Sequence, residues 1–213
     1  MKTEELVDML STDVSPVKRH AVTWTIGTAI AIGSVVAIGC MLVVLGIRGD
    51  LTNGPALAYL LAKLAFALTI VAVASIYLTR LARPGGENKT NAATIMAPFA
   101  IIVLLAAISF SLAPASHWNK LVAGTDWLEC ALSIPIIAVV PFAITIWAVR
   151  KTAPTNLVRT GAVAGLIAGG ISALGYALHC TDDSLPFVAF WYGGTIALCT
   201  LAGAVFGPRL LRW

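Results

Sequence analysis

Six apolar stretches, separated by short polar clusters, dominate the hydropathy pattern of the chain. Each stretch is close to the roughly 20 residues that an α-helix needs to cross the hydrocarbon core of a bilayer. The pattern predicts an all-α polytopic membrane protein. We expect a leader at residues 1–20, followed by a transmembrane domain at 21–213 that forms a bundle of six transmembrane helices. The expected spans are 24–47, 56–78, 94–113, 127–149, 161–178 and 187–206.

Composition agrees with this pattern and narrows the function classes. Of the 213 residues, 59% are hydrophobic and only 11% are charged, whereas about 25% of the residues of a soluble domain are charged. The net charge of +4 comes from basic residues scattered between the spans rather than gathered on one face, so we expect no direct contact with nucleic acid. About 20 residues precede the first span, which argues against a cleavable signal peptide.

The distribution of basic residues predicts the orientation. If the odd-numbered helices run outward, eleven basic residues lie on the inner side, against Arg48 and Lys120 on the outer side. Basic residues favour the cytoplasmic side, so both termini are expected in the cytoplasm (N-in/C-in). The inner eleven are Lys2, Lys18, Arg19, Arg80, Arg83, Lys89, Arg150, Lys151, Arg159, Arg209 and Arg212.

The remaining basic residue, Lys63, lies about two turns inside the second span. Its long side chain can extend to the outer interface, which is the interpretation we favour for a lone lysine there. The alternative is a buried cation beside a substrate or an acidic partner, because ionisable groups inside a membrane are costly and often functional.

Glycine spacing predicts how two of the helices pack. Gly161, Gly165 and Gly169 recur at every fourth position of the fifth span, and Gly203 and Gly207 do the same in the sixth. Small residues at this spacing let the backbones of membrane helices approach closely. Proline residues inside spans predict bends that either allow the bundle to pack or act as hinges. They are Pro98, Pro135 and Pro141.

A small membrane transporter is one candidate function, and the pattern gives it little support. The two halves of the chain show no three-plus-three inverted repeat, which many transporters contain. The spans also lack a mid-membrane carboxylate for proton coupling. A thiol- or metal-handling membrane protein is a second candidate, but the sequence has no Cys-x-x-Cys pair. We therefore do not expect an enzyme, and keep these two candidates as the alternative function.

Two cysteines are expected on the same outer rim. Cys130 lies about one turn inside the fourth helix, and Cys180 begins the loop after the fifth. They allow three interpretations: a sensing pair, a permanent disulfide, or two unpaired cysteines. A disulfide would add little stability because the membrane already holds these helix ends near each other, and this favours a sensing role. Possible supporting residues are Glu129, His179, Asp182 and Asp183.

A permanent metal or other cofactor is not expected. The spacing of the cysteines, histidines and carboxylates matches no zinc motif, although a soft heavy metal can bind transiently at Cys130 and Cys180. Cys40 and Cys199 lie within spans, where cysteine acts as a small apolar packing residue.

The leader predicts a short amphipathic docking helix. Glu4 and Glu5 lie in its first turn, where their negative charges interact favourably with the helix dipole. Apolar residues follow at helical spacing. Such a short helix is unstable alone, so it should order on a partner, and its acidic residues favour a basic protein surface. The opposing interpretation is a disordered segment without a partner. The candidate contact residues are Thr3, Glu4, Leu6, Val7, Leu10 and Asp13.

Several segments together resemble a known family. They are "DWLECALSIPIIAVVPFA", "YALHCTDDSLPFVAFWYG", "FGPRLLRW" and the leader positions Lys2, Thr3, Leu6, Leu10, Asp13, Pro16 and Val17. The chain is similar over its whole length to the NrsF-type family of membrane anti-sigma factors, described as negative regulators of sigma F.

The resemblance implies a location, a partner and a signal. The protein would lie in the bacterial inner membrane, and its leader would hold an extracytoplasmic-function sigma factor there. The resemblance also implies that Cys130 and Cys180 take part in stress or metal signalling. Oxidation, reduction or metal capture at these cysteines would then change how the fourth and fifth helices pack and cause the leader to release the sigma factor.

Overall fold

The computed structural model describes residues 3–12, 20–49, 54–83, 86 and 92–212, and these residues form helices and connecting turns without a strand. Six helical runs are long and apolar enough to cross a membrane. The long helices are α2 (Ala21–Val44), α3 (Gly54–Leu81), α4 (Ala92–Leu112), α6 (Trp127–Val149), α7 (Leu157–Ala177) and α9 (Gly193–Leu211). The short ones are α1 (Thr3–Ser11), η2 (Ala115–His117), α5 (Trp118–Ala123), α8 (Leu185–Phe187) and η3 (Val188–Tyr192).

The helix expected at 127–149 occupies those residues, as α6. The other five begin or end up to five residues away from the expected positions. The largest difference is in the last helical run, where α8, η3 and α9 follow one another to Leu211. The run continues past Pro208 because a proline removes only its own N–H donor and so weakens a final turn without preventing it.

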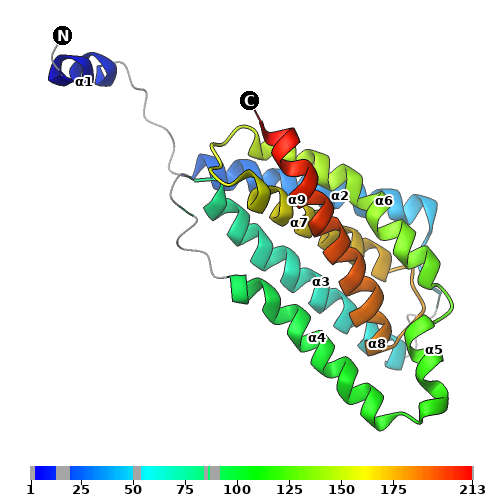
Figure 1. The fold of residues 1–213 in the computed structure, drawn as a ribbon. Helices are drawn as coiled ribbons and strands as arrows, with labels where there is room; N and C mark the ends of the chain where they lie inside the picture. Colours follow the sequence, from blue (N-terminus) through cyan, green and yellow to red (C-terminus); the bar gives the residue numbers. More distant parts are fainter. Residues whose placement is uncertain (1–2, 13–19, 50–53, 84–85, 87–91, 213) are drawn as a thin grey trace.

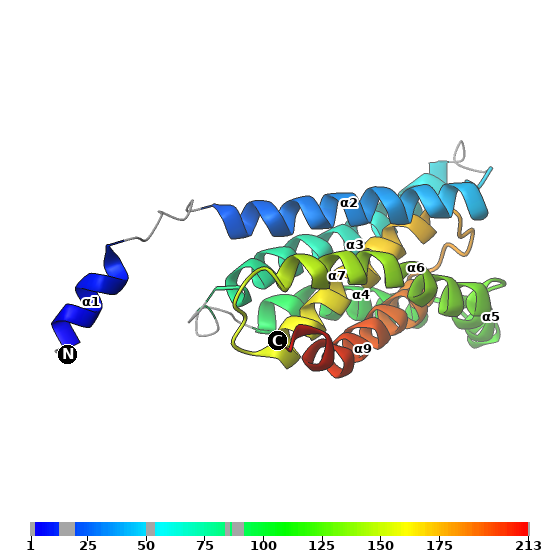
Figure 2. The same ribbon diagram turned by 90° about the horizontal axis from the view of Figure 1, so that it is seen from above.

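Helix α7 forms the centre of the bundle. It packs against α2, α3, α6 and α9, and Figures 1 and 2 show it enclosed by these four helices. In its most apolar stretch 72% of the residues are buried, against 17% for α4, which lies at the edge. Small residues make this central position possible because four neighbours must approach one helix.

The expected glycine contact is present between α7 and α9. A Cβ atom added at Gly207 would lie 2.6 Å from the Cα of Gly161, closer than real side chains approach backbone. Gly165 likewise faces the backbone of Cys199, and Gly203 faces that of Gly161. The two helices therefore touch backbone to backbone, which maximises dispersion contacts where lipid removes the hydrophobic term.

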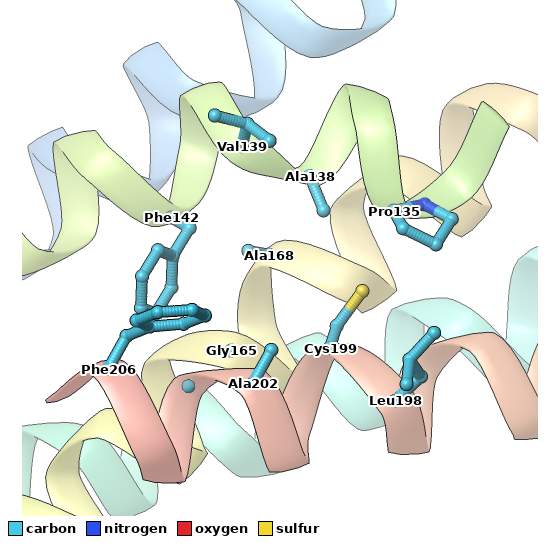
Figure 3. A pocket seen from close by; sticks show the side chains of 11 residues that line it. Pro135, Ala138, Val139, Phe142, Gly165, Ala168, Leu198, Cys199, Ala202 and Phe206 are labelled. Carbon is cyan, nitrogen blue, oxygen red and sulfur yellow. The ribbon is translucent and has the colours of Figure 1, made fainter. Parts of the chain in front are cut away.

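An apolar groove of about 360 Å³ lies between α6, α7 and α9. Phe142 of α6 and Phe206 of α9 line it, and in Figure 3 the side chain of Cys199 points into it. Cys199 is therefore a buried packing residue, as expected, whereas Cys40 is exposed on the surface of α2.

Helix α1 stands apart from the bundle in both views (Figures 1 and 2). All nine of its residues are exposed, including the apolar side chains of Leu6, Val7 and Leu10. A helix of this length gains too little from its own hydrogen bonds to be stable in isolation.

Replacement of Gly161 by alanine should destabilise the bundle, because the added methyl group must displace the backbone of α9. Overpacking of this kind typically costs about 1–3 kcal/mol. Gly39→Ala is the matched control, since a Cβ there meets nothing within 4 Å and alanine favours a helix by about 0.5–1 kcal/mol. Thermal unfolding in detergent should give a lower Tm for Gly161→Ala and an unchanged or higher Tm for Gly39→Ala. Equal Tm values would contradict the close contact.

Candidate functional site

The candidate site is built around residues 178–184, which join α7 to α8 and are called here the cysteine segment. Cys180 within it is 1% exposed, and Cys130, near the start of α6, is fully buried. Both belong to the main hydrophobic core, and hydrogen bonds of Thr181 and Asp182 with Asp126 hold the cysteine segment beside the start of α6. The structure thus brings the two cysteines together at one end of the bundle, with each thiol free.

Asp182 ties the cysteine segment to the start of α6. Its carboxylate accepts hydrogen bonds from the backbone N–H groups of Thr125, at 2.9 Å, and Asp126, at 2.8 Å. The first N–H groups of a helix have no partner within it, and a negative charge there is favoured by the helix dipole. Gly124 makes the approach possible, because its φ is +57° and a side chain there would collide with Asp182.

Asp183, the next residue, points to two cations on other helices. Its carboxylate lies 2.9 Å from the Nζ of Lys63 and 2.9 Å from the Nη1 of Arg48. Both cations also donate to the backbone carbonyl of Cys180, Arg48 at 2.9 Å and Lys63 at 3.2 Å. Arg48, Lys63 and Asp183 are called here the charge cluster. It fixes the cysteine segment against the end of α2 and the side of α3.

This arrangement corrects the interpretation favoured for Lys63. The side chain does not extend to the interface: it is 0% exposed, and Arg48 is only 5% exposed. The alternative, a buried cation beside an acidic partner, is correct, and the partner is Asp183. Pairing wins because a buried ammonium group is costly unless a counter-charge and hydrogen bonds replace water.

Burial and charge act in opposite directions on the groups of the cysteine segment. Partial burial alone would raise the pKa of Asp183, but hydrogen bonds and charge from Arg48 and Lys63 outweigh it, and the pKa is lowered. At Cys180 burial prevails and raises the pKa of the thiol, although the positive charge of Lys63 opposes it. The Cys180 thiol is therefore protonated at neutral pH and shielded from solvent.

Two tyrosines line the buried side of the site. Tyr176 and Tyr192 are fully buried with ring centroids 6.1 Å apart. Neither hydroxyl has a hydrogen-bond partner of good geometry among the described residues. The Nζ of Lys63 lies 5.9 Å from the centre of the Tyr192 ring, a distance at which a cation is attracted to the aromatic face.

Two other expected supporting residues lie at the edge of the site. The Nε2 of His179 is 4.0 Å from the carboxylate of Glu129, the outer limit of an ion pair, and the Glu129 side chain is mostly exposed. The Nδ1 of His179 lies 3.3 Å from the carbonyl oxygen of Gly46, a second link to the end of α2. Among the described residues no three cysteine, histidine or carboxylate side chains gather as metal ligands would.

The leader residues lie outside this site. Thr3, Glu4, Leu6, Val7 and Leu10 are all on α1, whose residues are exposed. Asp13, the remaining candidate of the leader, lies outside the residues that the structure describes.

Sequence reasoning did not assign four residues that complete the site. Arg48 was used only to count charge, and Thr125, Tyr176 and Tyr192 had no assigned role. An arginine directly after a span, opposite an Asp-Asp pair expected on the same rim, was the available signal. It indicates an ion pair but not which of the two aspartates forms it.

Comparisons with known proteins identify the family of the chain. A family model described as "Negative regulator of sigma F" (NrsF) matches residues 10–213. The chain is 30% identical to a probable anti-sigma-F factor NrsF of Azospira oryzae and 28% identical to the anti-sigma-F factor NrsF of Caulobacter vibrioides, in each case over all of both chains. No solved structure matches the chain significantly. The chain therefore belongs to the NrsF family, which is regulatory rather than catalytic.

The lowered pKa of Asp183 predicts how stability depends on pH. A carboxyl group whose pKa is lowered by folding stabilises the protein above its ordinary pKa of about 3.9, and this contribution is lost as the pH falls through the folded value. The Tm difference between the wild type and Asp183→Asn should be constant from pH 7 to 5 and shrink below about pH 4. Glu4→Gln removes one exposed carboxyl group and should change the Tm little. A wild-type advantage that persists unchanged at pH 3 would contradict the ion pair.

Proposed function

We propose that this member of the NrsF family is an inner-membrane anti-sigma factor. In this proposal the leader binds an extracytoplasmic-function sigma factor in the cytoplasm, and a stress signal at Cys130 and Cys180 releases it. The observation that carries the proposal is full-length similarity to two anti-sigma-F factors in a chain whose first helix exposes an apolar face. The proposal requires one soluble partner, the sigma factor. The lipid bilayer surrounds the six helices.

The leader has the chemistry of a docking segment. Leu6 and Leu10 are four residues apart and lie on one face of α1, 40% and 68% exposed. Glu4, Glu5 and Asp8 add three negative charges to the same helix. An amphipathic helix of this kind binds in an apolar groove through side chains at such spacing. Its acidic residues match a partner with a basic rim around that groove.

The proposed topology places the two halves of this function on opposite sides of the membrane. The ends of α3 and α6 that carry Arg80, Arg83, Arg150 and Lys151 face the cytoplasm by the charge rule. The start of α2, which follows the leader, lies at that same end. The cysteine segment then faces the periplasm, where an oxidising environment permits thiol chemistry.

The cysteine pair is the proposed sensor. Hydrogen peroxide that reaches the buried thiols during a local opening of the cysteine segment would join them in a disulfide, with two electrons and two protons passing to the peroxide to give two waters. A soft metal ion would instead displace both thiol protons and bridge the sulfur atoms. Either event supplies a large free energy, and about 5.5 kcal/mol is needed to move a two-state equilibrium from 1:99 to 99:1.

Replacement of Leu6 and Leu10 together by alanine should weaken binding of the sigma factor at least about tenfold, which corresponds to about 1.4 kcal/mol. The full-length protein in detergent is titrated with the purified sigma factor. Ser11→Ala, at the end of the same helix, is the control and should bind as the wild type does. Deletion of residues 1–20 should abolish binding, and retained binding would transfer the contact to the inner loops.

Replacement of Cys130 or Cys180 by serine should remove the response to hydrogen peroxide and to soft metals. The measurement is transcription from a promoter that depends on the sigma factor, with and without the stress. Cys40→Ser and Cys199→Ser are matched controls, because these cysteines lie away from the cysteine segment. Unchanged induction in the Cys130→Ser Cys180→Ser double variant would refute the sensor.

The alternative function, a small transporter or a thiol- or metal-handling membrane protein, predicts different behaviour. Such a protein would move a metal ion or electrons in vesicles that contain no sigma factor. The exposed apolar face of α1 has no part in that activity, so the leader is the feature that favours the regulator. Transport by vesicles of the leader deletion at the wild-type rate would support the alternative.

A further inference from the structure

The charge cluster is placed between the cysteine segment and α2, the helix that directly follows the leader. Asp183 and Cys180 supply its acceptors, Arg48 follows the end of α2, and Lys63 lies on α3. It is therefore the polar connection through which a movement of the cysteine segment reaches two other helices. Arg48 adds a backbone link, because its N–H donates to the carbonyl of Leu178 at 3.1 Å.

We propose that Arg48, Lys63 and Asp183 couple the cysteine segment to α2: the cluster is closed while the leader holds its partner, and it opens when the cysteines react. This inference rests on the function proposed above. It assigns the three residues a positioning role in signal transmission and no part in the thiol chemistry itself.

The first argument is the charge balance. Two cations share one carboxylate in a place where Lys63 is 0% exposed and Arg48 is 5% exposed. If Asp183 moves away, the ammonium group of Lys63 loses the carboxylate of its ion pair while it stays buried beside the Arg48 guanidinium, which strongly disfavours the packed state. The ends of α2 and α3 must then rearrange. The cluster is consequently a two-position element: closed with Asp183 in place, or open.

The second argument is the position of Cys180 within the cluster. Its carbonyl oxygen accepts from both Arg48 and Lys63, while its side chain is the buried thiol. A new bond at the sulfur changes the position of the same residue whose backbone holds the two cations. The reacting sulfur and the carbonyl oxygen that the cluster binds therefore belong to the same residue.

The third argument is the continuity of α2. It runs without interruption for 24 residues from Ala21 to Val44, so a shift at its Arg48 end is carried to the end that follows the leader. At that far end the Nη2 of Arg83 donates to Thr23 at 3.1 Å, which links α2 to α3 again. Both helices held by the charge cluster are thus joined beside the leader.

The test measures binding of the purified sigma factor to the full-length protein in detergent, without any oxidant or metal. Asp183→Asn should weaken binding at least tenfold. It should do so equally in the Cys130→Ser Cys180→Ser background, because the cluster acts after the cysteines. Asp183→Glu keeps the charge and should restore most of the affinity. Lys120→Met removes an exposed cation from the same end of the bundle and should bind as the wild type does.

Lys63→Met is the second variant, and it decides the test alone if Asp183→Asn is not recovered as a folded protein. It leaves Arg48 paired with Asp183 but removes the contact of the cluster with α3, and binding should weaken at least threefold. Wild-type affinity in a folded Asp183→Asn or Lys63→Met variant would overturn the inference. The inference would also be overturned if Asp183→Asn weakened binding only when Cys130 and Cys180 are both present, because the cluster would then act on the thiols. Failure of the proposed function is distinguishable, since the wild type itself would then not bind the sigma factor.

Discussion

The ion pairing of Asp183 with Arg48 and Lys63 is the interaction on which this end of the molecule depends. Two cations lie almost without solvent in a bundle made largely of apolar residues. Such groups are tolerated only when a counter-charge and hydrogen bonds replace the lost water. The carboxylate of Asp183 supplies a counter-charge, and it accepts hydrogen bonds together with the backbone carbonyl of Cys180. The position of the cysteine segment is therefore an electrostatic requirement, and hydrophobic packing alone would not specify it.

The two neighbouring aspartates hold the cysteine segment from opposite sides. Asp182 binds the start of α6, the helix that carries Cys130, and Asp183 binds the ends of α2 and α3. The carboxylates of these successive residues thus have different partners, one at the start of α6 and one at the ends of α2 and α3. Cys180 lies two residues before this pair and is fixed by it. The arrangement explains how a buried thiol stays shielded in a connecting segment, which would ordinarily be exposed.

Much of the fold could be predicted from the sequence because membrane helices follow simple physical rules. The length of the apolar stretches predicts six spans, and the spacing of Gly161, Gly165 and Gly203 predicts that two helices each offer a face for close approach; the structure shows that these two faces contact each other. The site was harder. Spacing placed Cys130 and Cys180 on one rim, but the partner of Lys63 depends on three-dimensional contact between α3 and residues 178–184. A lone lysine in a span can avoid burial of its charge by extending its side chain to the interface. Only the observed ion pair with Asp183 excludes this.

The backbone contact between α7 and α9 also determines where the bundle can yield. At Gly161, Gly165, Gly203 and Gly207 no side chain separates the two helices, so neither can shift without losing contact along the seam. Helix α2 packs less tightly against α7: a Cβ at Gly175 would meet the Cβ of Met41 and atoms of Ile38 at ordinary distances of 3.7–3.8 Å. Side-chain contacts can readjust by rotamer changes at a smaller cost than backbone contacts. In the proposed mechanism, a change in the cysteine segment therefore moves α2 and α3, which the charge cluster contacts, while α7 and α9 stay together as the fixed part of the bundle.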